Sequence, residues 1–277
     1  PLIADVRTML ELLRKIGAEV DLDEMSHSVR IKVAHVKSTR LLKSLCGKIR
    51  TSILFAGPLL GRCSRATIYP PGGDVIGHRR IDTHIDGLKA LGATVKVSGP
   101  YDFRAPSGLK GARILLDEAS VTATENLIMA AVLAHGTTEL YNSACEPHVC
   151  NLCDMLNSMG AKISGIGTNL LVVEGVEKLH GAEVEIGGDY IDAGSYITAA
   201  LVTGGELTVE GVSVSDFEVL EFIEEANGNE YKLKLFGQFD AHPKYDFIQM
   251  SIKYSSSKVM FNELTEVSWF EDKRFFL

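Results

Sequence analysis

Long apolar runs are missing from this sequence: it contains no stretch of about 18 consecutive apolar residues, the length that a membrane-spanning helix needs. Its first residues, Pro-Leu-Ile-Ala-Asp, also lack the basic and apolar segments of a secretory signal peptide. An excess of positive charge is missing too, because the formal net charge is −8. We therefore expect a cytoplasmic protein that neither spans a membrane nor binds nucleic acid through a basic surface.

Paired cysteine motifs are also scarce. The five cysteines are Cys46, Cys63, Cys145, Cys150 and Cys153. An odd number without a secretion signal favours free thiols in a reducing compartment. Cys150 and Cys153 form one CxxC motif, but the sequence has no second pair to complete a structural zinc site. We expect structural thiols, with no metal site and no cofactor.

The most regular feature that is present is a repeated helical phrase. Three amphipathic helix patterns each end in a glycine, the residue that suits a left-handed helix cap. Their ranges are 9–20, 84–95 and 152–163. The glycines are Gly17, Gly92 and Gly160, which lie 75 and 68 residues apart. Repetition at this spacing predicts a few related supersecondary units arranged about a pseudo-symmetric axis.

Nearly apolar helices alternate with the amphipathic ones. They open at Ser52, Thr124 and Ser195, and a strand follows each of them. Helices that are apolar all round are buried on every side, whereas amphipathic helices cover a sheet face. We therefore predict an α/β (α+β) fold of repeated βαβαββ-like units with buried helices at its centre. The expected domains are residues 1–187 and a partial second domain, residues 188–277.

The densest group of chemically active side chains lies in the loop at residues 70–84. Two prolines and three glycines accompany Asp74, Arg79, Arg80 and two histidines within these 15 residues. Glycine lets the backbone take positive φ and approach a ligand closely. Such a loop presents Asp74 as a proton donor or acceptor beside cationic anchors for an anionic substrate. The alternative is an ordinary polar surface turn.

Ser120, Val121 and Thr122 form a second candidate binding segment. They precede a helix that we expect to begin near Thr124. The amide end of a helix binds anions, so this segment is a candidate anion site. The alternative is that Ser120 or Thr122 only caps the helix.

Several segments match one known family in order and spacing. They are 50–62 (Arg-Thr-Ser-Ile-Leu-Phe-Ala-Gly-Pro-Leu-Leu-Gly-Arg), 71–74 (Pro-Gly-Gly-Asp) with Gly77, Arg79, Asp82 and His84, 120–124 (Ser-Val-Thr-Ala-Thr) and 160–168. On these residues the chain, from about residue 1 to residue 211, resembles the enolpyruvyl transferases. The resemblance implies the fold of that family, an inside-out α/β barrel of two domains that each contain three related units.

The resemblance also implies an activity. It is strongest for the branch of the family that moves the enolpyruvyl group of phosphoenolpyruvate to the 3-hydroxyl of UDP-N-acetylglucosamine. That reaction passes through a tetrahedral intermediate, releases phosphate and is the first committed step of peptidoglycan synthesis. The implied partners are these two small molecules, and no cofactor or metal is implied.

The resemblance assigns roles to individual residues. Positions that contact uridine match Asp82, Thr83 and His84, and positions that hold the UDP diphosphate match Ser120, Val121 and Thr122. Arg79 matches an arginine that holds phosphate, and its alternative is a solvated loop charge. Arg50 matches an arginine near the active-site cleft, and its alternative is an ion pair between domains. The alternative for His84 is a helix cap.

Asp74 occupies the mobile-loop position at which the family usually has cysteine, although some members carry aspartate. With a pKa raised by partial burial, this carboxyl group can exchange a proton with the C-3 methylene of phosphoenolpyruvate or assist the departure of phosphate. It offers no thiolate for alkylation. The resemblance therefore predicts resistance to the epoxide antibiotic fosfomycin, which attacks that cysteine.

Other positions depart from the family pattern. The Lys-Asn pair that engages both substrates is expected before residue 1, and the arginine that grips phosphoenolpyruvate is expected beyond residue 277. Asp246 stands in for the base that takes the proton of the sugar hydroxyl. Glu118 replaces the usual lysine and Arg80 the usual proline.

Two interpretations of the function remain open on the sequence. The first is a transferase, present here as an incomplete chain or an unusual short version. The second is a degenerate, non-catalytic paralogue that binds a UDP-sugar but lacks the residues that hold phosphoenolpyruvate.

Overall fold

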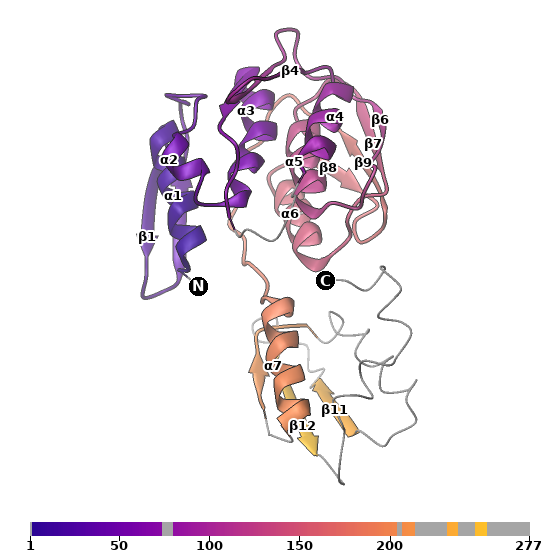
Figure 1. The fold of residues 1–277 in the computed structure, drawn as a ribbon. Coiled ribbons are helices and arrows are strands. Elements are labelled where there is room, and N and C mark those ends of the chain that lie inside the picture. The colour runs from indigo at the N-terminus through magenta and orange to yellow at the C-terminus, as the bar shows by residue number, and fades with distance from the viewer. Residues whose placement is uncertain (1, 74–79, 204–206, 214–231, 238–246, 254–277) are drawn as a thin grey trace. The chain divides into compact units, whose positions relative to one another are not determined.

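The computed structural model of the chain describes residues 2–73, 80–203, 207–213, 232–237 and 247–253 (Figure 1). The chain forms two compact units, residues 1–184 and residues 185–277. The domain boundary expected between residues 187 and 188 stays a prediction. None of the helices in the described ranges has both the length and the hydropathy needed to cross a membrane.

A helix and a hairpin open the first unit. They are α1 (Ala4–Ile16), β1 (Glu19–Asp23) and β2 (Ser28–Lys32), and the two strands pair antiparallel. α1 ends where Gly17 takes a φ of 109° and its N–H donates to Arg14 O at 3.1 Å. This is the left-handed cap that the Gly-Ala pattern predicts.

Two larger groups of elements follow in the same unit. The first contains α2 (Lys43–Cys46), the 3-10 helix η1 (Arg50–Phe55), α3 (Ala56–Cys63), β3 (Arg65–Ile68), α4 (Asp82–Ala90), β4 (Thr94–Val97) and β5 (Tyr101–Arg104). The second contains β6 (Arg113–Leu115), α5 (Val121–Ala131), β7 (Thr137–Tyr141), α6 (Pro147–Ser158), β8 (Lys162–Ser164) and β9 (Leu170–Glu174).

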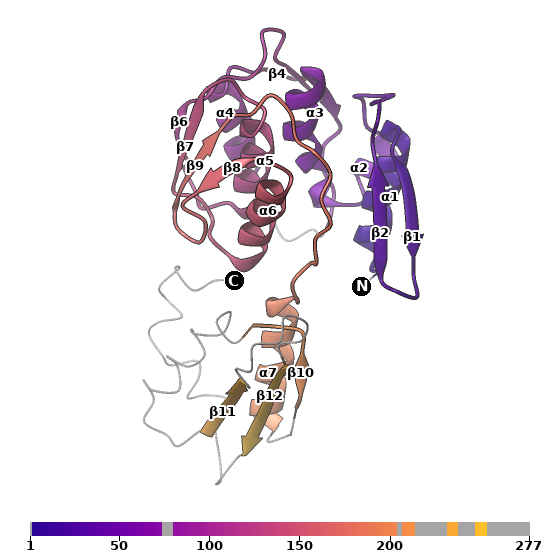
Figure 2. The same cartoon turned by 180° about the vertical axis from the view of Figure 1, so that it is seen from behind.

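The second unit is described in part. It contains α7 (Tyr190–Thr203), β10 (Val209–Glu210), β11 (Lys232–Gly237) and β12 (Phe247–Lys253). Its strands form an antiparallel sheet beside α7 (Figure 2). The carboxylate of Asp189 caps α7, because Asp189 Oδ1 accepts from the N–H groups of Ile191 and Asp192 at 3.1 and 3.0 Å.

One strand order recurs in three sheets. It is β3-β5-β4 in one sheet, β7-β9-β8 within the four-stranded sheet, and β10-β12-β11 in the second unit. In the four-stranded sheet β6 pairs parallel to β7, and a parallel bridge from Arg40 to Thr67 takes the corresponding place beside β3. The repeated βαβαββ plan and the mixed α/β (α+β) class are therefore confirmed. No sheet of the described residues closes on itself.

α5 lies at the centre of the first unit, as its apolar sequence predicts. It contacts α3, α4, α6 and strands β7 and β9. Leu127, Ile128, Ala130 and Ala131 are each 0% exposed. Because α5 is buried, residues 120–122 at its start are held in a fixed position.

Three details of the helices differ from the sequence prediction. The helix expected from Ser52 is divided into η1 and α3, because Pro58 has no N–H to continue an α-helical ladder and is tolerated only in a first turn. α5 begins at Val121 instead of near Thr124, because Ser120 caps it. α7 begins at Tyr190, ahead of Ser195.

Complete burial of the third apolar helix, α7, was also a wrong prediction. Ala193 and Ile197 are buried, whereas Ile191 is 47% exposed and Tyr196 is 60% exposed. The spacing of Ala193 and Ile197 places them on one helix face. Among the described side chains of α7, only this face is buried, and Ile191 and Tyr196 lie outside it.

Candidate functional site

The amide ends of α4 and α5 lie together in the first unit. The hydroxyl of Thr83, in the first turn of α4, donates to Asp117 Oδ1 at 2.6 Å, just ahead of α5. His84 Nε2 lies 3.3 Å from Thr122 Oγ1 in the first turn of α5. We call residues 82–84 and 120–122 the helix-start site. The structure therefore brings together the two segments that the sequence assigns to one nucleotide.

The close approach of these helices depends on a glycine. Gly87 is buried on α4, and a Cβ built there would lie 2.4 Å from Leu127 Cδ1 on α5. No side chain fits into that distance without displacing the leucine. Gly87 thus permits α4 to lie close enough for its first turn to reach α5.

Ser120 is the N-cap of α5. Its hydroxyl accepts from the N–H of Ala123 at 3.3 Å. The capping role considered for Ser120 is therefore confirmed. By helix geometry the N–H groups of Val121 and Thr122 have no acceptor within the helix, so they can donate to an anion at this end.

His84 is a buried residue of α4 and does not cap it. Ile81 holds the N-cap position, while His84 is 2% exposed. Its two ring nitrogens face Asn126 Nδ2 at 3.1 Å and Thr122 Oγ1 at 3.3 Å. Burial, with a smaller contribution from the charge of Arg50, lowers the pKa of His84 from 6.5 to about 4. The ring is therefore neutral at physiological pH.

Arginines and carboxylates lie at the edge of the site. Arg50 Nη2 donates to Arg80 O at 2.5 Å, and Arg80 Nε forms an ion pair with Asp82 Oδ2 at 2.6 Å. The hydrogen bond to Asp82, together with the charges of Asp82, Asp117 and Glu118, raises the pKa of Arg80. The two departures from the family pattern, Arg80 and Glu118, thus carry opposite charges in one neighbourhood.

The first residues of the Pro-Gly-Gly loop are held against the turn before η1. Gly72 N donates to Cys46 O at 2.9 Å, and a Cβ built on Gly72 would lie 1.8 Å from Gly47 O. Gly73 has a φ of 96°, which favours glycine. The close backbone approach expected of these glycines occurs here against the protein itself. A Cβ built on Gly73 would lie 3.3 Å from Arg50 Cβ, so the described start of the loop also lies against Arg50.

Three predicted site residues lie outside the described residues. They are Asp74, Arg79 and Asp246. Their roles stay predictions.

Asn126 is the site residue that the sequence did not point to. It is a buried amide at the start of the apolar part of α5, where it contacts η1, α3 and α4. The available signal was a polar residue directly ahead of an apolar run, since a buried polar side chain needs partners and so marks a junction. The sequence alone did not indicate that Ile53, Gly57 and His84 are the partners of this amide.

Glu125 and Glu146 form a second ionisable pair, at the junction of α5 and α6. Burial, and next the charge of Glu146, raises the pKa of Glu125 from 4.5 to about 7. Glu146 is the N-cap residue of α6 with Pro147 at the first position, which confirms the helix start expected there. Among the described residues, the buried Oε2 atom of Glu146 has no hydrogen-bond partner.

Cys150 and Cys153 both lie on α6 beside this pair. All five cysteines are free, and Cys153 is buried. Burial raises the pKa of both thiols, that of Cys153 to about 12. The CxxC motif therefore holds protonated thiols, which are poor nucleophiles.

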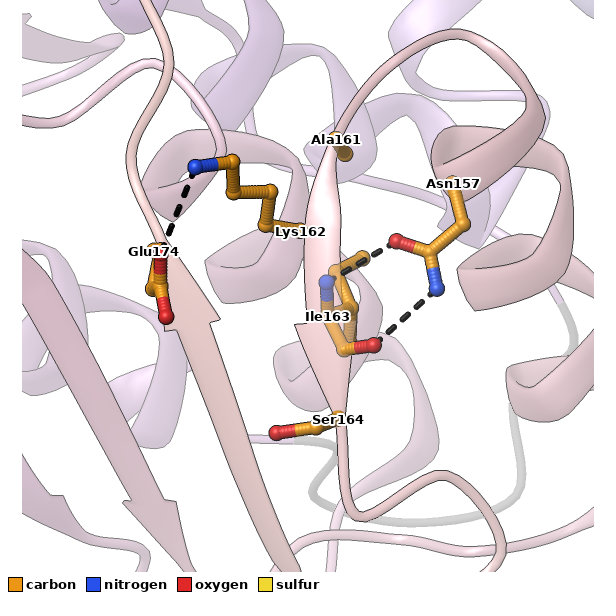
Figure 3. Close-up of a pocket in the computed structure, with 6 residues that line it drawn as sticks. All are labelled: Asn157, Ala161, Lys162, Ile163, Ser164 and Glu174. Atoms are coloured by element: carbon orange, nitrogen blue, oxygen red, sulfur yellow. Dashed lines mark hydrogen bonds and ion pairs between the residues drawn. The ribbon is translucent and has the colours of Figure 1, made fainter.

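A surface pocket lies elsewhere, at the end of α6 and the start of β8 (Figure 3). Its lining is Asn157, Ala161, Lys162, Ile163, Ser164 and Glu174. The Asn157 side chain accepts from Ile163 N at 2.8 Å and donates to Ile163 O at 3.0 Å, and Lys162 Nζ lies 3.6 Å from Glu174 Oε2. These groups satisfy one another, and none belongs to the helix-start site.

Comparison with known proteins gives one consistent family. The profile of the family described as EPSP synthase (3-phosphoshikimate 1-carboxyvinyltransferase) matches residues 1–260. The chain is 50% identical over 220 residues to the UDP-N-acetylglucosamine 1-carboxyvinyltransferase of Treponema denticola, covering 79% of this chain and 51% of that protein. It is 44% identical over 252 residues to the Treponema pallidum protein of the same name, covering 89% and 59%.

Solved structures agree on the fold. The enolpyruvyl transferase NikO from Streptomyces tendae matches with a TM-score of 0.71 at 19% identity, over 92% of this chain and 59% of that chain. An EPSP synthase from Acinetobacter baumannii matches with a TM-score of 0.64 at 19% identity, over 91% and 57%. The chain thus spans between half and two thirds of the length of the relatives it matches.

Proposed function

The chain belongs to the EPSP synthase family, and on that premise we propose that it is part of an enolpyruvyl transferase acting on UDP-N-acetylglucosamine. The donor is phosphoenolpyruvate, and the reaction is the first committed step of peptidoglycan synthesis. The name shared by the relatives at 44% and 50% identity supports this acceptor. We place the reaction in the cytoplasm, in keeping with five free cysteines.

The observation that carries the proposal is the meeting of two helix starts. A diphosphate carries negative charge, and the positive ends of α4 and α5 both lie at the helix-start site. Val121 and Thr122 supply backbone donors to the diphosphate. Asp82, which is exposed, binds on the uridine side.

The remaining roles belong to residues outside the described ranges. Asp246 takes the proton of the sugar 3-hydroxyl, whose oxygen attacks C-2 of phosphoenolpyruvate. Asp74 gives a proton to C-3, which forms the tetrahedral intermediate. Loss of a proton from C-3 and departure of phosphate then restore the double bond. Arg79 holds the phosphate group during these steps.

The first experiment measures activity. The intact protein encoded by the gene is mixed with phosphoenolpyruvate and UDP-N-acetylglucosamine, and released phosphate is measured. We expect phosphate release that depends on both substrates. Binding of the UDP-sugar without turnover would support the non-catalytic paralogue instead.

The second experiment tests the anion site with a backbone change. Val121→Pro removes one N–H at the first position of α5, where proline is tolerated because Ser120 has an extended ψ of 119°. We expect the Kd for UDP-N-acetylglucosamine, measured by calorimetry, to rise at least about tenfold with an unchanged Tm.

A matched control is available at another helix start. Ala4→Pro makes the same change at the first position of α1, where Ile3 is also extended. It should leave the Kd unchanged. Equal effects of both substitutions on the Kd, or no effect of Val121→Pro, would show that the diphosphate does not bind at the start of α5.

A further inference from the structure

The side chain of Asn126 has a fixed orientation. It is 0% exposed, and its Oδ1 accepts from the N–H of Gly57 at 2.7 Å. Its Nδ2 donates to the carbonyl oxygen of Ile53 at 3.1 Å. A backbone N–H can only donate and a carbonyl can only accept, so rotating the amide by 180° would break both bonds.

This orientation determines where His84 carries its proton. The second hydrogen of Asn126 Nδ2 points to His84 Nδ1 at 3.1 Å, so Nδ1 must accept. The proton of the neutral ring is therefore on Nε2. A doubly protonated ring is disfavoured, since burial and the charge of Arg50 lower the pKa of His84 to about 4.

The proton on Nε2 in turn orients Thr122. His84 Nε2 lies 3.3 Å from Thr122 Oγ1, so the hydroxyl oxygen accepts from the ring. A hydroxyl that accepts through its oxygen keeps its own hydrogen for another acceptor. Thr122 is the second residue of α5, so that hydrogen is available at the amide end of the helix.

We propose that Asn126 and His84 are positioning residues that hold the Thr122 hydroxyl as a hydrogen-bond donor to the diphosphate of a nucleotide sugar. The assignment rests on the proposed function, because it takes the ligand from it. It adds a side-chain donor to the backbone donors of α5. It also explains why an amide and an imidazole lie buried together in an apolar core, at a cost in desolvation that hydrogen bonds offset.

The first test observes the ring of His84 in the unsubstituted chain. Nitrogen NMR of the histidine-labelled 277-residue chain, without ligand, distinguishes a protonated from an unprotonated ring nitrogen. The His84 signals are assigned by their loss in His84→Gln. We expect an unprotonated Nδ1 and a protonated Nε2 at pH 7. A protonated Nδ1 would overturn the proposal.

The second test measures binding of UDP-N-acetylglucosamine by calorimetry. Thr122→Val removes the hydroxyl at nearly constant volume, and we expect the Kd to rise about tenfold. Thr138→Val is the control, because it makes the same change outside the helix-start site, at a buried threonine whose hydroxyl has no hydrogen-bond partner among the described residues. It should leave the Kd unchanged.

A double-substitution cycle separates positioning from general stability. In Asn126→Asp the side chain can no longer donate to Nδ1, so nothing fixes Nδ1 as the unprotonated nitrogen and the Thr122 hydroxyl loses its fixed orientation. We expect Asn126→Asp to raise the Kd when it is made alone. Added to Thr122→Val, it should raise the Kd no further. Additive losses would overturn the proposal.

The outcomes also separate the two proposals. Binding by the parent chain with no effect of Thr122→Val would overturn this assignment and leave the proposed function standing. No binding by the intact protein encoded by the gene would overturn the proposed function, and the assignment with it. The tautomer measurement remains decisive if Asn126→Asp does not fold.

Discussion

The buried His84 and the half-buried Glu125 respond to pH in opposite directions. His84 has a folded pKa of about 4, below its ordinary 6.5, so its contribution to stability is complete above pH 6.5 and is lost as the pH falls toward 4. Glu125 has a folded pKa of about 7, above its ordinary 4.5. Its contribution is complete below pH 4.5 and is lost as the pH rises through 7. The two residues together favour a stability maximum in the weakly acidic range.

Replacing Glu125 tests this description. Glu125→Gln keeps the shape of the side chain and removes its charge, so we expect the free energy of unfolding at pH 8 to rise by about 2 kcal/mol. At pH 4 the two chains should be equally stable. Urea denaturation at both pH values measures the difference. Glu11→Gln, on the exposed face of α1, should change neither value.

Asp74 leads to a prediction about inhibition. The intact enzyme should retain its phosphate release in fosfomycin, because a carboxylate in place of the loop cysteine gives no thiolate to alkylate. Asp74→Cys should make the enzyme sensitive. Mass spectrometry after incubation checks for the adduct, and covalent labelling of Asp74 with loss of activity would refute the prediction.

The sequence was sufficient to name most residues of the helix-start site but not the amide behind it. Ser120 and its neighbours follow a local rule, since helix starts bind anions and prefer serine caps. Asn126 instead contacts residues that are 42, 69 and 73 positions away in the chain. No local pattern encodes such distances, so this hub becomes visible only after α3, α4 and α5 have packed.

At the scale of elements, the sequence predicted the helices better than their ends. The capping glycines appear as expected, with φ of 109°, 92° and 95° at Gly17, Gly92 and Gly160. The division between η1 and α3 was missed because apolar composition does not report where a hydrogen-bond ladder breaks. Exposure of one face of α7 was missed because composition does not say which neighbours a helix has.

The crossing of α3 and α5 yields a prediction. A Cβ at Gly57 would lie 2.2 Å from Asn126 O and 2.8 Å from Asn126 Oδ1, both on a buried helix. Gly57→Ala should therefore lower the free energy of unfolding by about 3 kcal/mol, since the helices must separate.

The next glycine on the same helix is the control. A Cβ at Gly61 would meet Leu133 at 3.4 Å, an ordinary contact. Gly61→Ala should change stability by less than about 1 kcal/mol, because helix propensity favours alanine. Urea denaturation compares the two, and equal effects would argue against the tight crossing.

At the scale of the whole molecule, the first unit has its own core. The main cluster of buried apolar residues runs from Leu12 to Val173, within residues 1–184. We therefore expect residues 1–184, expressed alone, to unfold cooperatively in thermal circular dichroism. Leu127→Ala in this fragment should cost about 3 kcal/mol, which shows that the transition reports the native core. A gradual, non-cooperative transition would contradict this expectation.

The repeated plan was predictable from glycine spacing, and the recurring strand order now shows which helices correspond. By that order α7 is the counterpart of α5, and their first turns are equivalent places in two copies of one module. The two helices differ in the side chain that precedes them. A neutral hydroxyl precedes α5, whereas a carboxylate precedes α7 and already neutralises the positive end of its dipole. Of these two equivalent helix starts, the one capped by serine can therefore accept an anion, whereas the one capped by aspartate repels it.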